Sequence, residues 1–263
     1  MIPKIIHYCW YGGAPHNEMV KKCIASWKKV LPDYEIICWD ESNTPFKQIP
    51  ILKVMYKRKK WAFIADYMRF YSLYFKGGIY LDTDIEMIKP FGDMMKLSSF
   101  TGFQTAFDQS RHPINTALLG GIPKHPFFKD CLEMTEKKQR LYFHQMGSPT
   151  IASPYLIDRG VSEHKTQEVD GVTVFTKDYF YPYYHRIEEF SEDCITENTV
   201  CIHWWADSWS EKNRTLSYKL NSAISKLKRV PRMSYDWFIF LFFHSRFYDC
   251  MKTEHLHEKQ SEN

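Results

Sequence analysis

Two aspartates, Asp82 and Asp84, have the spacing of a metal-binding pair. They directly follow the apolar segment 79–81, and alternate residues of an extended chain point to the same side. Both carboxylates can therefore face one ion, and hard oxygen ligands suit Mg²⁺ or Mn²⁺, which keep positions for substrate phosphates. A D-x-D pattern alone is weak evidence, because a chain of this length contains on the order of one by chance.

A second charged pair precedes the D-x-D pattern. Asp66 and Arg69 are three residues apart in segment 60–76, which has helical periodicity, so they share one face. As an exposed ion pair they would stabilise the helix by only about 0.3 kcal/mol. This helix is apolar nearly all round, however, and charges on such a helix are buried and paired or line a site. Gly77 and Gly78 end the helix just before the D-x-D strand. We therefore predict that the Asp66–Arg69 pair and the D-x-D pair belong to one site.

Two residues farther along the chain are further candidates. His203 is a candidate third metal ligand, because imidazole completes many carboxylate sites; the alternative is a histidine of the core or surface. It begins the sequence HWWADSW, whose aromatic rings suit stacking on bases or sugars. Asn115, ahead of an expected loop at Gly120–Gly121, could bind a sugar hydroxyl or form a turn.

The positions of these residues depend on the expected fold. Apolar segments 5–10 and 34–39 predict strands on either side of a helix, which makes a β-α-β opening. In such sheets ligands bind at the carboxyl ends of the strands, where Tyr8, Trp10 and Asp40 could contact a base or ribose.

The later segments alternate in the same way. We expect short strands over 100–107 and 199–205, a pair of strands over 171–180, and a helix over 126–141. Together with the opening unit, this pattern predicts an α/β fold.

The composition indicates a folded protein. Of 263 residues, 44% are hydrophobic and 17% aromatic, enough for a sizeable core. The net charge is +4 and no nucleic-acid-binding signature is present, so no nucleic-acid partner is expected. Seven scattered cysteines without a C-x-x-C pair suit a reducing cytosol. Because the N-terminus does not look like a signal peptide, we expect a cytoplasmic protein.

The C-terminal part differs in composition from the rest. Residues 1–232 are expected to form the main domain, 233–251 an aromatic and basic helix, and 252–263 a disordered tail. The helix has two interpretations. It lies in a membrane interface, which would place the protein peripherally at the inner face of the plasma membrane, or it docks on the main domain.

A phosphatase of the haloacid dehalogenase type also carries D-x-D after an apolar strand. Such an enzyme needs Thr or Val two residues past the second Asp, and Glu86 stands there. Its motif also lies near the start of the fold, which is not the case here. These two departures disfavour a phosphatase.

The chain resembles the family 32 glycosyltransferases, the group with a sugar-binding region containing D-x-D. The resemblance rests on four blocks that span residues 2–209 in the family's order: IPKIIHYCWYGG, SWKKVLPDYEIICWD, AFIADYMRFYSLYFKGGIYLDTDIEMIKP and IHWWADSW. The group includes bacterial capsule and lipopolysaccharide transferases. The glucosylating domains of large clostridial toxins share the D-x-x-R helix followed by D-x-D.

The resemblance implies a GT-A type fold, a Rossmann-like mixed sheet flanked by helices, with a helical C-terminal extension. It also implies a retaining reaction with a nucleotide-diphosphate sugar and a divalent cation, Mn²⁺ or Mg²⁺. By position, Asp66 and Arg69 hold the donor sugar and its phosphates. Asp84 ligates the metal, and Asp82 contacts the metal together with ribose or sugar.

The resemblance also assigns residues at the two ends of the donor. Trp10 and Asp40 map near the nucleoside. Ser208 and Trp209, with His203, fall where a C-terminal loop closes over the diphosphate. In some relatives a carboxylate or Asn replaces His203, and the loop after Trp39 varies in length.

We therefore expect a hexosyltransferase that uses a UDP-hexose, Gal or Glc, in preference to GDP-mannose. Its acceptor is a growing, lipid-linked surface polysaccharide. Retention goes through a covalent carboxylate intermediate or through attack on the same face; no carboxylate clearly qualifies as nucleophile, which favours the second.

Two other functions stay open. One is a non-catalytic protein that binds nucleotide sugars or glycans, and the other is an effector that glycosylates a protein. The complete set of acidic and basic site residues disfavours the first. The small size and the basic, aromatic C-terminal part disfavour the second.

Overall fold

A computed structural model describes residues 1–142 and 147–206. The described residues divide into two units, Met1–Ser42 with Ala65–Ala206, and Asn43–Ile64. The expected domain end at 232, the helix 233–251 and the tail 252–263 therefore lie outside the described residues.

The secondary structure alternates between strands and helices. The strands are β1 Ile5–Cys9, β2 Glu35–Trp39, β3 Gly78–Leu81, β4 Ile85–Met87, β5 Ser99–Phe103, β6 Ile114–Gly121, β7 Gln167–Val169, β8 Val172–Phe175 and β9 Cys201–His203. The helices are α1 Glu18–Val30, α2 Pro50–Lys57, α3 Trp61–Lys76, α4 Pro126–Tyr142, α5 Pro149–Ile157 and α6 Lys177–Phe180, with 3₁₀ turns at Gly92–Lys96 and Glu192–Cys194. None of the helices described has the length and apolar character that crossing a membrane requires.

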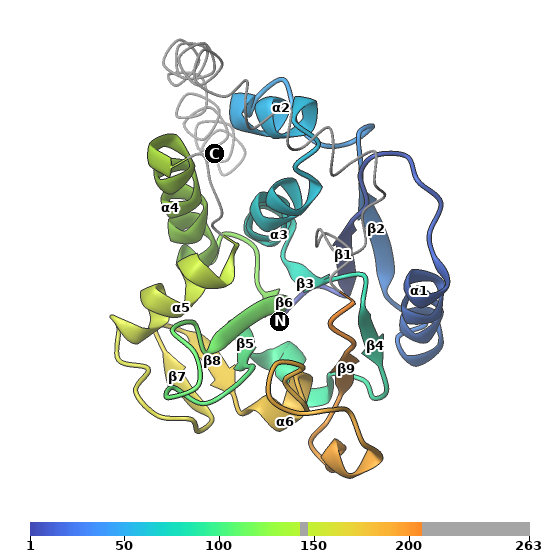
Figure 1. The fold of residues 1–263 in the computed structure, drawn as a ribbon, viewed down its shortest axis with the longest axis vertical. Coiled ribbons are helices and arrows are strands. Elements are labelled where there is room, and N and C mark those ends of the chain that lie inside the picture. The colour runs from blue at the N-terminus through green and yellow to red at the C-terminus, as the bar shows by residue number, and fades with distance from the viewer. Residues whose placement is uncertain (143–146, 207–263) are drawn as a thin grey trace, which may run out of the picture. The chain divides into compact units, whose positions relative to one another are not determined.

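A seven-stranded mixed sheet forms the centre of the first unit, in the order β2-β1-β3-β6-β5-β8-β7 (Figure 1). β1 runs parallel to both β2 and β3, whereas β6 runs antiparallel to β3 and β5. A small antiparallel sheet pairs β4 with β9. The expected fold class, a mixed α/β sheet flanked by helices, is confirmed.

The Gly77–Gly78 pair does more than end a helix. The backbone of Gly78 has a φ of 104°, and a Cβ there would lie 2.5 Å from the carbonyl oxygen of Ile5. Only glycine allows this close approach of β3 to β1. The strand that leads into Asp82 therefore runs through the middle of the sheet, next to β1 and β6.

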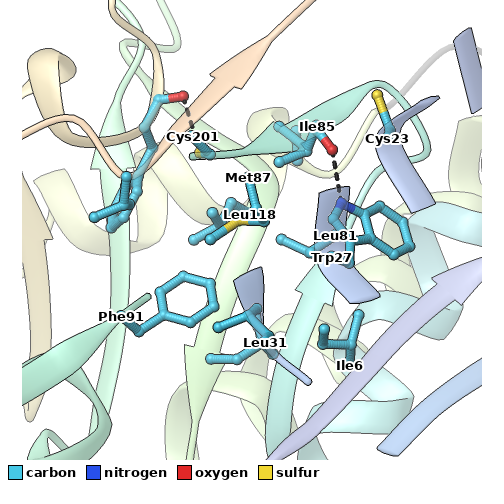
Figure 2. Close-up of a cluster of buried hydrophobic side chains, with 14 of the residues drawn as sticks. Ile6, Cys23, Trp27, Leu31, Leu81, Ile85, Met87, Phe91, Leu118 and Cys201 are labelled. Carbon is cyan, nitrogen blue, oxygen red and sulfur yellow. Dashed lines mark hydrogen bonds between the residues drawn. The ribbon is translucent and has the colours of Figure 1, made fainter. Parts of the chain in front are cut away.

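A buried cluster fixes the chain on the other side of the D-x-D turn. Figure 2 shows Trp27 of α1 among apolar side chains, with its indole Nε1 donating a hydrogen bond of 2.7 Å to the carbonyl oxygen of Ile85. Trp27 is completely buried. Since Ile85 begins β4, this bond ties α1 to the residue that follows Asp84 in the chain.

The expected loop at Gly120–Gly121 is wrong, because both residues lie in β6. A Cβ on Gly120 would lie 2.3 Å from the ring of Phe100, and one on Gly121 would lie 2.3 Å from the ring of Phe128. The two glycines therefore make room for aromatic rings in the core instead of forming a turn.

Other boundaries also differ from expectation. Segment 171–180 forms the single strand β8 followed by α6, and its partner strand β7 lies before it. The last strand is confined to Cys201–His203. Helix α5, with Pro149 in its first turn and Pro154 in its interior, was not expected.

We predict that Gly120→Ala destabilises the protein by about 1–3 kcal/mol, because the added methyl group overlaps the Phe100 ring. Urea unfolding measures the loss. Phe100→Leu in the Gly120→Ala background removes the overlap, so the double variant should be more stable than the sum of the two single losses implies. Strict additivity would contradict this account of the glycine.

His7 on β1 is completely buried and is held as a neutral imidazole. Its Nε2 lies 2.9 Å from the carbonyl oxygen of Gly77, to which it must donate, and its Nδ1 accepts from the indole Nε1 of Trp39 at 3.2 Å. An imidazolium carries a proton on both ring nitrogens, so its Nδ1 could not accept the bond from Trp39. Burial accordingly lowers the pKa of His7 to about 4.

We predict that His7 makes the protein less stable in mild acid. Below the usual histidine pKa of about 6.5 the unfolded state binds a proton that the folded state refuses, so stability falls between pH 6.5 and 4, by up to about 3 kcal/mol. Urea unfolding at pH 7 and pH 5 should show a smaller difference for His7→Gln than for the native chain. An equal difference would contradict the prediction.

Candidate functional site

Asp82 and Asp84 lie in a turn between β3 and β4, just beyond the end of the strand. The N–H of Asp82 donates to the carbonyl oxygen of Ala117 on β6 at 2.8 Å, and the N–H of Ile85 donates to the carbonyl oxygen of Asp82 at 3.1 Å. The sequence argument assumed alternation along an extended chain. In the structure the turn brings the two carboxylates to one side.

His203 reaches the same place from a distant part of the chain. It lies on β9 opposite Ile85 of β4, and its Nε2 is 3.3 Å from Oδ1 of Asp84. The segment after β9 adds two backbone bonds, because the N–H of Trp204 donates to the carbonyl oxygen of Asp84 and that of Ala206 donates to its Oδ2, both at 2.9 Å. Asp84 is therefore held on three sides.

The three side chains form a group that fits a metal ion. One ligand atom from each of Asp82, Asp84 and His203 lies within 4.8 Å of the other two. His203 also has a buried Nδ1 without a hydrogen-bond partner among the residues described. Two carboxylates with one imidazole suit a divalent cation such as Mn²⁺.

The pKa values of the two carboxyls in this group are shifted in opposite directions. Burial, countered by Arg69 and reinforced by the charge of Asp84, raises the pKa of Asp82 to about 6. Burial would also raise the pKa of Asp84, but His203 and the N–H of Ala206 outweigh it and hold that pKa below its usual value. A divalent cation would favour the ionised form of both carboxyls.

Arg69 joins the acidic group to helix α3. Its Nη2 lies 3.1 Å from Oδ1 of Asp66 and 3.2 Å from Oδ1 of Asp82. Its Nη1 donates to the carbonyl oxygen of Thr116 at 2.7 Å, and its side chain lies over the Tyr80 ring. Burial alone would lower the pKa of Arg69, but the charges around it, Asp82 first, raise the pKa above its ordinary value.

The surroundings of Arg69 bear on its predicted role. The sequence suggested that it binds donor phosphates or sugar. Its two terminal nitrogens bind acceptors of the protein, and its Nε is buried without a partner among the residues described. Arg69 thus pairs with both Asp66 and Asp82, and its contact with the donor stays a prediction.

Tyr8, Trp10 and Asp40 lie on or just beyond the carboxyl ends of the parallel strands β1 and β2, as expected. The N–H of Trp10 donates to the carbonyl oxygen of Trp39, and its indole lies edge-on to His16 at 4.8 Å between ring centroids. Oδ1 of Asp40 accepts bonds from the N–H and hydroxyl of Ser42. Tyr8 is buried at 7% exposure. Contact with a nucleoside stays a prediction.

Asn115 does not precede a loop, because it lies inside β6 and is buried. Its Nδ2 donates to Oε1 of Gln104 at 2.6 Å, and its Oδ1 accepts from the N–H groups of Thr116 and Ala117 at 2.6 and 2.7 Å. These bonds satisfy the backbone where the pairing with β5 shifts register. Asn115 therefore does not form a turn, and its contact with a sugar hydroxyl stays a prediction.

Two hydroxyl groups at the site were not expected. Thr116 and Ser148 lie 2.6 Å apart, and each bonds to one member of the Asp66–Arg69 pair. Nothing local in the sequence distinguishes these two residues from other hydroxyl residues. Ser208 and Trp209, which were predicted to close over the diphosphate, lie outside the described residues.

The part of the chain that carries Asp66, Arg69, Asp82 and Asp84 matches a known protein family. Residues 17–103 match the model of the "Glycosyltransferase sugar-binding region containing DXD motif". Mannosyl phosphorylinositol ceramide synthase CSH1 of Saccharomyces cerevisiae is 29% identical over 150 residues, which are 54% of this chain and 38% of that protein. Inositol phosphoceramide mannosyltransferase 3 of Schizosaccharomyces pombe is 37% identical over 91 residues, 32% of this chain and 24% of that protein.

A solved structure of the galactosyltransferase LgtC, in complex with donor and acceptor sugar analogs, matches with a TM-score of 0.47 and 13% identity, over 79% of this chain and 90% of that one. The expected class of enzyme, a glycosyltransferase, is supported by the matched region and by the names of the relatives. The chain spans less than two fifths of the length of the first curated relatives that it matches.

We predict that Asp84→Asn weakens Mn²⁺ binding, because it removes a charged ligand. Loss of a residue that only supports a metal ligand weakens binding by roughly 10- to 100-fold, so loss of the ligand itself should weaken it at least as much. Electron paramagnetic resonance of free Mn²⁺ measures the affinity. Asp93→Asn is the control, since Asp93 is exposed and pairs with Lys96. Equal affinity in both variants would show that the ion does not bind at this group.

Proposed function

We propose that this chain is a retaining, metal-dependent glycosyltransferase that moves a hexose from a nucleotide-diphosphate sugar to a glycan acceptor. The observation that carries the proposal is the group of Asp82, Asp84 and His203, joined through Arg69 to Asp66 and lying largely in the matched region. The narrower assignment to family 32, with its likeness to the clostridial glucosylating domains, is part of the proposal.

The residues divide the work as follows. Asp82, Asp84 and His203 would hold the divalent ion, which when bound stabilises negative charge on the leaving diphosphate. Arg69 keeps Asp66 and Asp82 oriented by pairing with both. The aromatic residues beyond the ends of β1 and β2 bind the nucleoside, with Trp10 as a stacking surface.

The state of the carboxylates supports attack on the same face of the sugar. Oδ1 of Asp66 is bonded to Arg69 and Ser148, and Oδ1 of Asp82 is bonded to Arg69 and Tyr80. Charge pairing and hydrogen bonding of this kind stabilise a carboxylate and make it a weaker nucleophile. A covalent glycosyl intermediate on either residue is therefore the less favoured route.

The names of the relatives bear on donor and acceptor. Four of them name a mannosyl product or mannosyl transfer with an inositol phosphoceramide, a lipid, as partner. We therefore propose GDP-mannose as the first donor to test, with UDP-galactose and UDP-glucose as the alternatives. A lipid-linked glycan is the proposed acceptor, reached by a cytoplasmic protein in peripheral contact with the membrane.

We predict that the protein hydrolyses one nucleotide sugar from a panel of GDP- and UDP-hexoses, that Mn²⁺ or Mg²⁺ is required, and that EDTA abolishes the reaction. Release of the nucleoside diphosphate measures turnover, and NMR of transfer products shows whether the anomeric configuration is retained. Binding without turnover would favour a non-catalytic nucleotide-sugar-binding protein. Turnover that EDTA does not change would contradict the role of the metal.

A further inference from the structure

Ser148 occupies a position where serine usually serves another purpose. It directly precedes α5, followed by Pro149 in the first turn, which is the arrangement of a helix N-cap. Its side chain makes no capping bond. Instead its hydroxyl lies 2.6 Å from Oδ1 of Asp66 and 2.6 Å from the hydroxyl of Thr116, and the residue is 1% exposed.

The number of protons on each group determines which atom donates in each hydrogen bond. A carboxylate paired with Arg69 accepts hydrogen bonds, so Ser148 gives its one proton to Asp66. The hydroxyl of Thr116 must then donate to Ser148, and it accepts from Nη1 of Arg69 at 3.1 Å. Since Nη2 of Arg69 also forms an ion pair with Oδ1 of Asp66, three hydrogen bonds and one ion pair join the four side chains in a closed ring.

The ring uses only one oxygen of the Asp66 carboxylate. Within residues 1–142 and 147–206, the hydrogen bonds and the ion pair of that carboxylate all go to Oδ1. Gly147 lies beside the other oxygen: a Cβ on it would lie 3.9 Å from Oδ2 of Asp66. Among the described residues that are not its chain neighbours, only Pro149 would be nearer, at 3.6 Å. The ring thus fixes the direction of Oδ2, and Gly147 places no side chain beside it.

We propose that Gly147, Ser148 and Thr116 are positioning residues that set Asp66 to accept a hydrogen bond, through Oδ2, from a hydroxyl group of the donor hexose. This inference rests on the proposed function. The hydroxyls of Ser148 and Thr116 hold the carboxylate against rotation, and the absence of a side chain at residue 147 admits the sugar. A fixed acceptor beside the reacting sugar costs no reorganisation when the substrate binds.

α5 itself provides the matched control. Ser153 is also a completely buried serine of this segment, and its hydroxyl bonds the N–H and the carbonyl oxygen of Ile114 on β6. Ser153→Ala and Ser148→Ala each remove one buried hydroxyl that ties this part of the chain to neighbouring elements. Only Ser148 belongs to the ring around Asp66. A purely structural role of Ser148 would make the two variants alike.

The first test compares turnover with stability in four single variants and one double variant, using the nucleotide sugar that the native chain hydrolyses. We expect Ser148→Ala and Thr116→Val to lower kcat by on the order of 10- to 100-fold, and the two together to cost little more than either alone, since both open the same ring. Thr116→Ser keeps the hydroxyl and should retain kcat. Ser153→Ala should lower Tm about as much as Ser148→Ala and leave kcat within about twofold of the native chain.

The second test fills the space beside Oδ2. The Cβ of Gly147→Ala meets its neighbours at ordinary contact distances, so Tm should stay unchanged. We expect KM for the donor to rise, and donor binding measured by calorimetry to weaken, while Mn²⁺ affinity is unaffected. With a donor analogue that lacks the hydroxyl bound by Asp66, Ser148→Ala and the native chain should have similar kcat values.

The outcomes distinguish failure of the positioning role from failure of the proposed function. An active native enzyme whose kcat is insensitive to Ser148→Ala and Thr116→Val overturns the positioning role alone and leaves the proposed function standing. The same holds if Ser153→Ala lowers kcat as strongly as Ser148→Ala. A native chain that neither binds nor hydrolyses any nucleotide sugar removes the proposed function and this inference with it.

Discussion

The pairing of Arg69 with two carboxylates is the interaction on which the rest of the site depends. Arg69 is 6% exposed and Asp66 is 8% exposed, on a helix whose other residues are largely apolar. Burying such charges is costly unless each has partners, and removing one partner leaves the others uncompensated. The partners of Arg69 come from α3, the D-x-D turn and β6, and Ser148, just before α5, donates a hydrogen bond to its partner Asp66. These elements must therefore meet in one arrangement.

The core holds the D-x-D turn from both sides, so that the turn has little freedom. Before the turn, Gly78 brings β3 close to β1, and the N–H of Asp82 is bonded to β6. After it, the indole of Trp27 holds Ile85 (Figure 2), and β4 pairs with β9, which carries His203. The group of Asp82, Asp84 and His203 is thus positioned by apolar packing and backbone hydrogen bonds, which are insensitive to salt. A site preorganised in this way does not have to be rebuilt when a ligand arrives.

The sequence predicted the parts of the site that carry a local signal. Apolar runs and paired glycines located α3, β3 and the turn, and the residue types pointed to Asp66, Asp82, Asp84 and His203. The hydroxyls of Thr116 and Ser148 carry no such signal, because their partners lie far away in the chain: Ser148 and Asp66 are 82 residues apart. For the same reason Gly120 looked like part of a loop, since the ring of Phe100 that requires it is visible only in the folded chain. Spacing and residue type show chemistry within one element, whereas contacts between elements need the structure.

The balance of charge explains why the site suits a divalent cation. The guanidinium of Arg69 pairs with Asp66 and Asp82, and Asp84 lies beside Asp82, so full ionisation of the three carboxyls would leave two negative charges among these four side chains. Without a cation this charge is relieved only in part: the pKa of Asp82 stands near 6, and Asp84 depends on His203 and the N–H of Ala206. Arg69 cannot give up its proton, so it cannot adjust to the deficit. A doubly charged ion matches the deficit, whereas a monovalent ion would leave one negative charge buried in surroundings that penalise it.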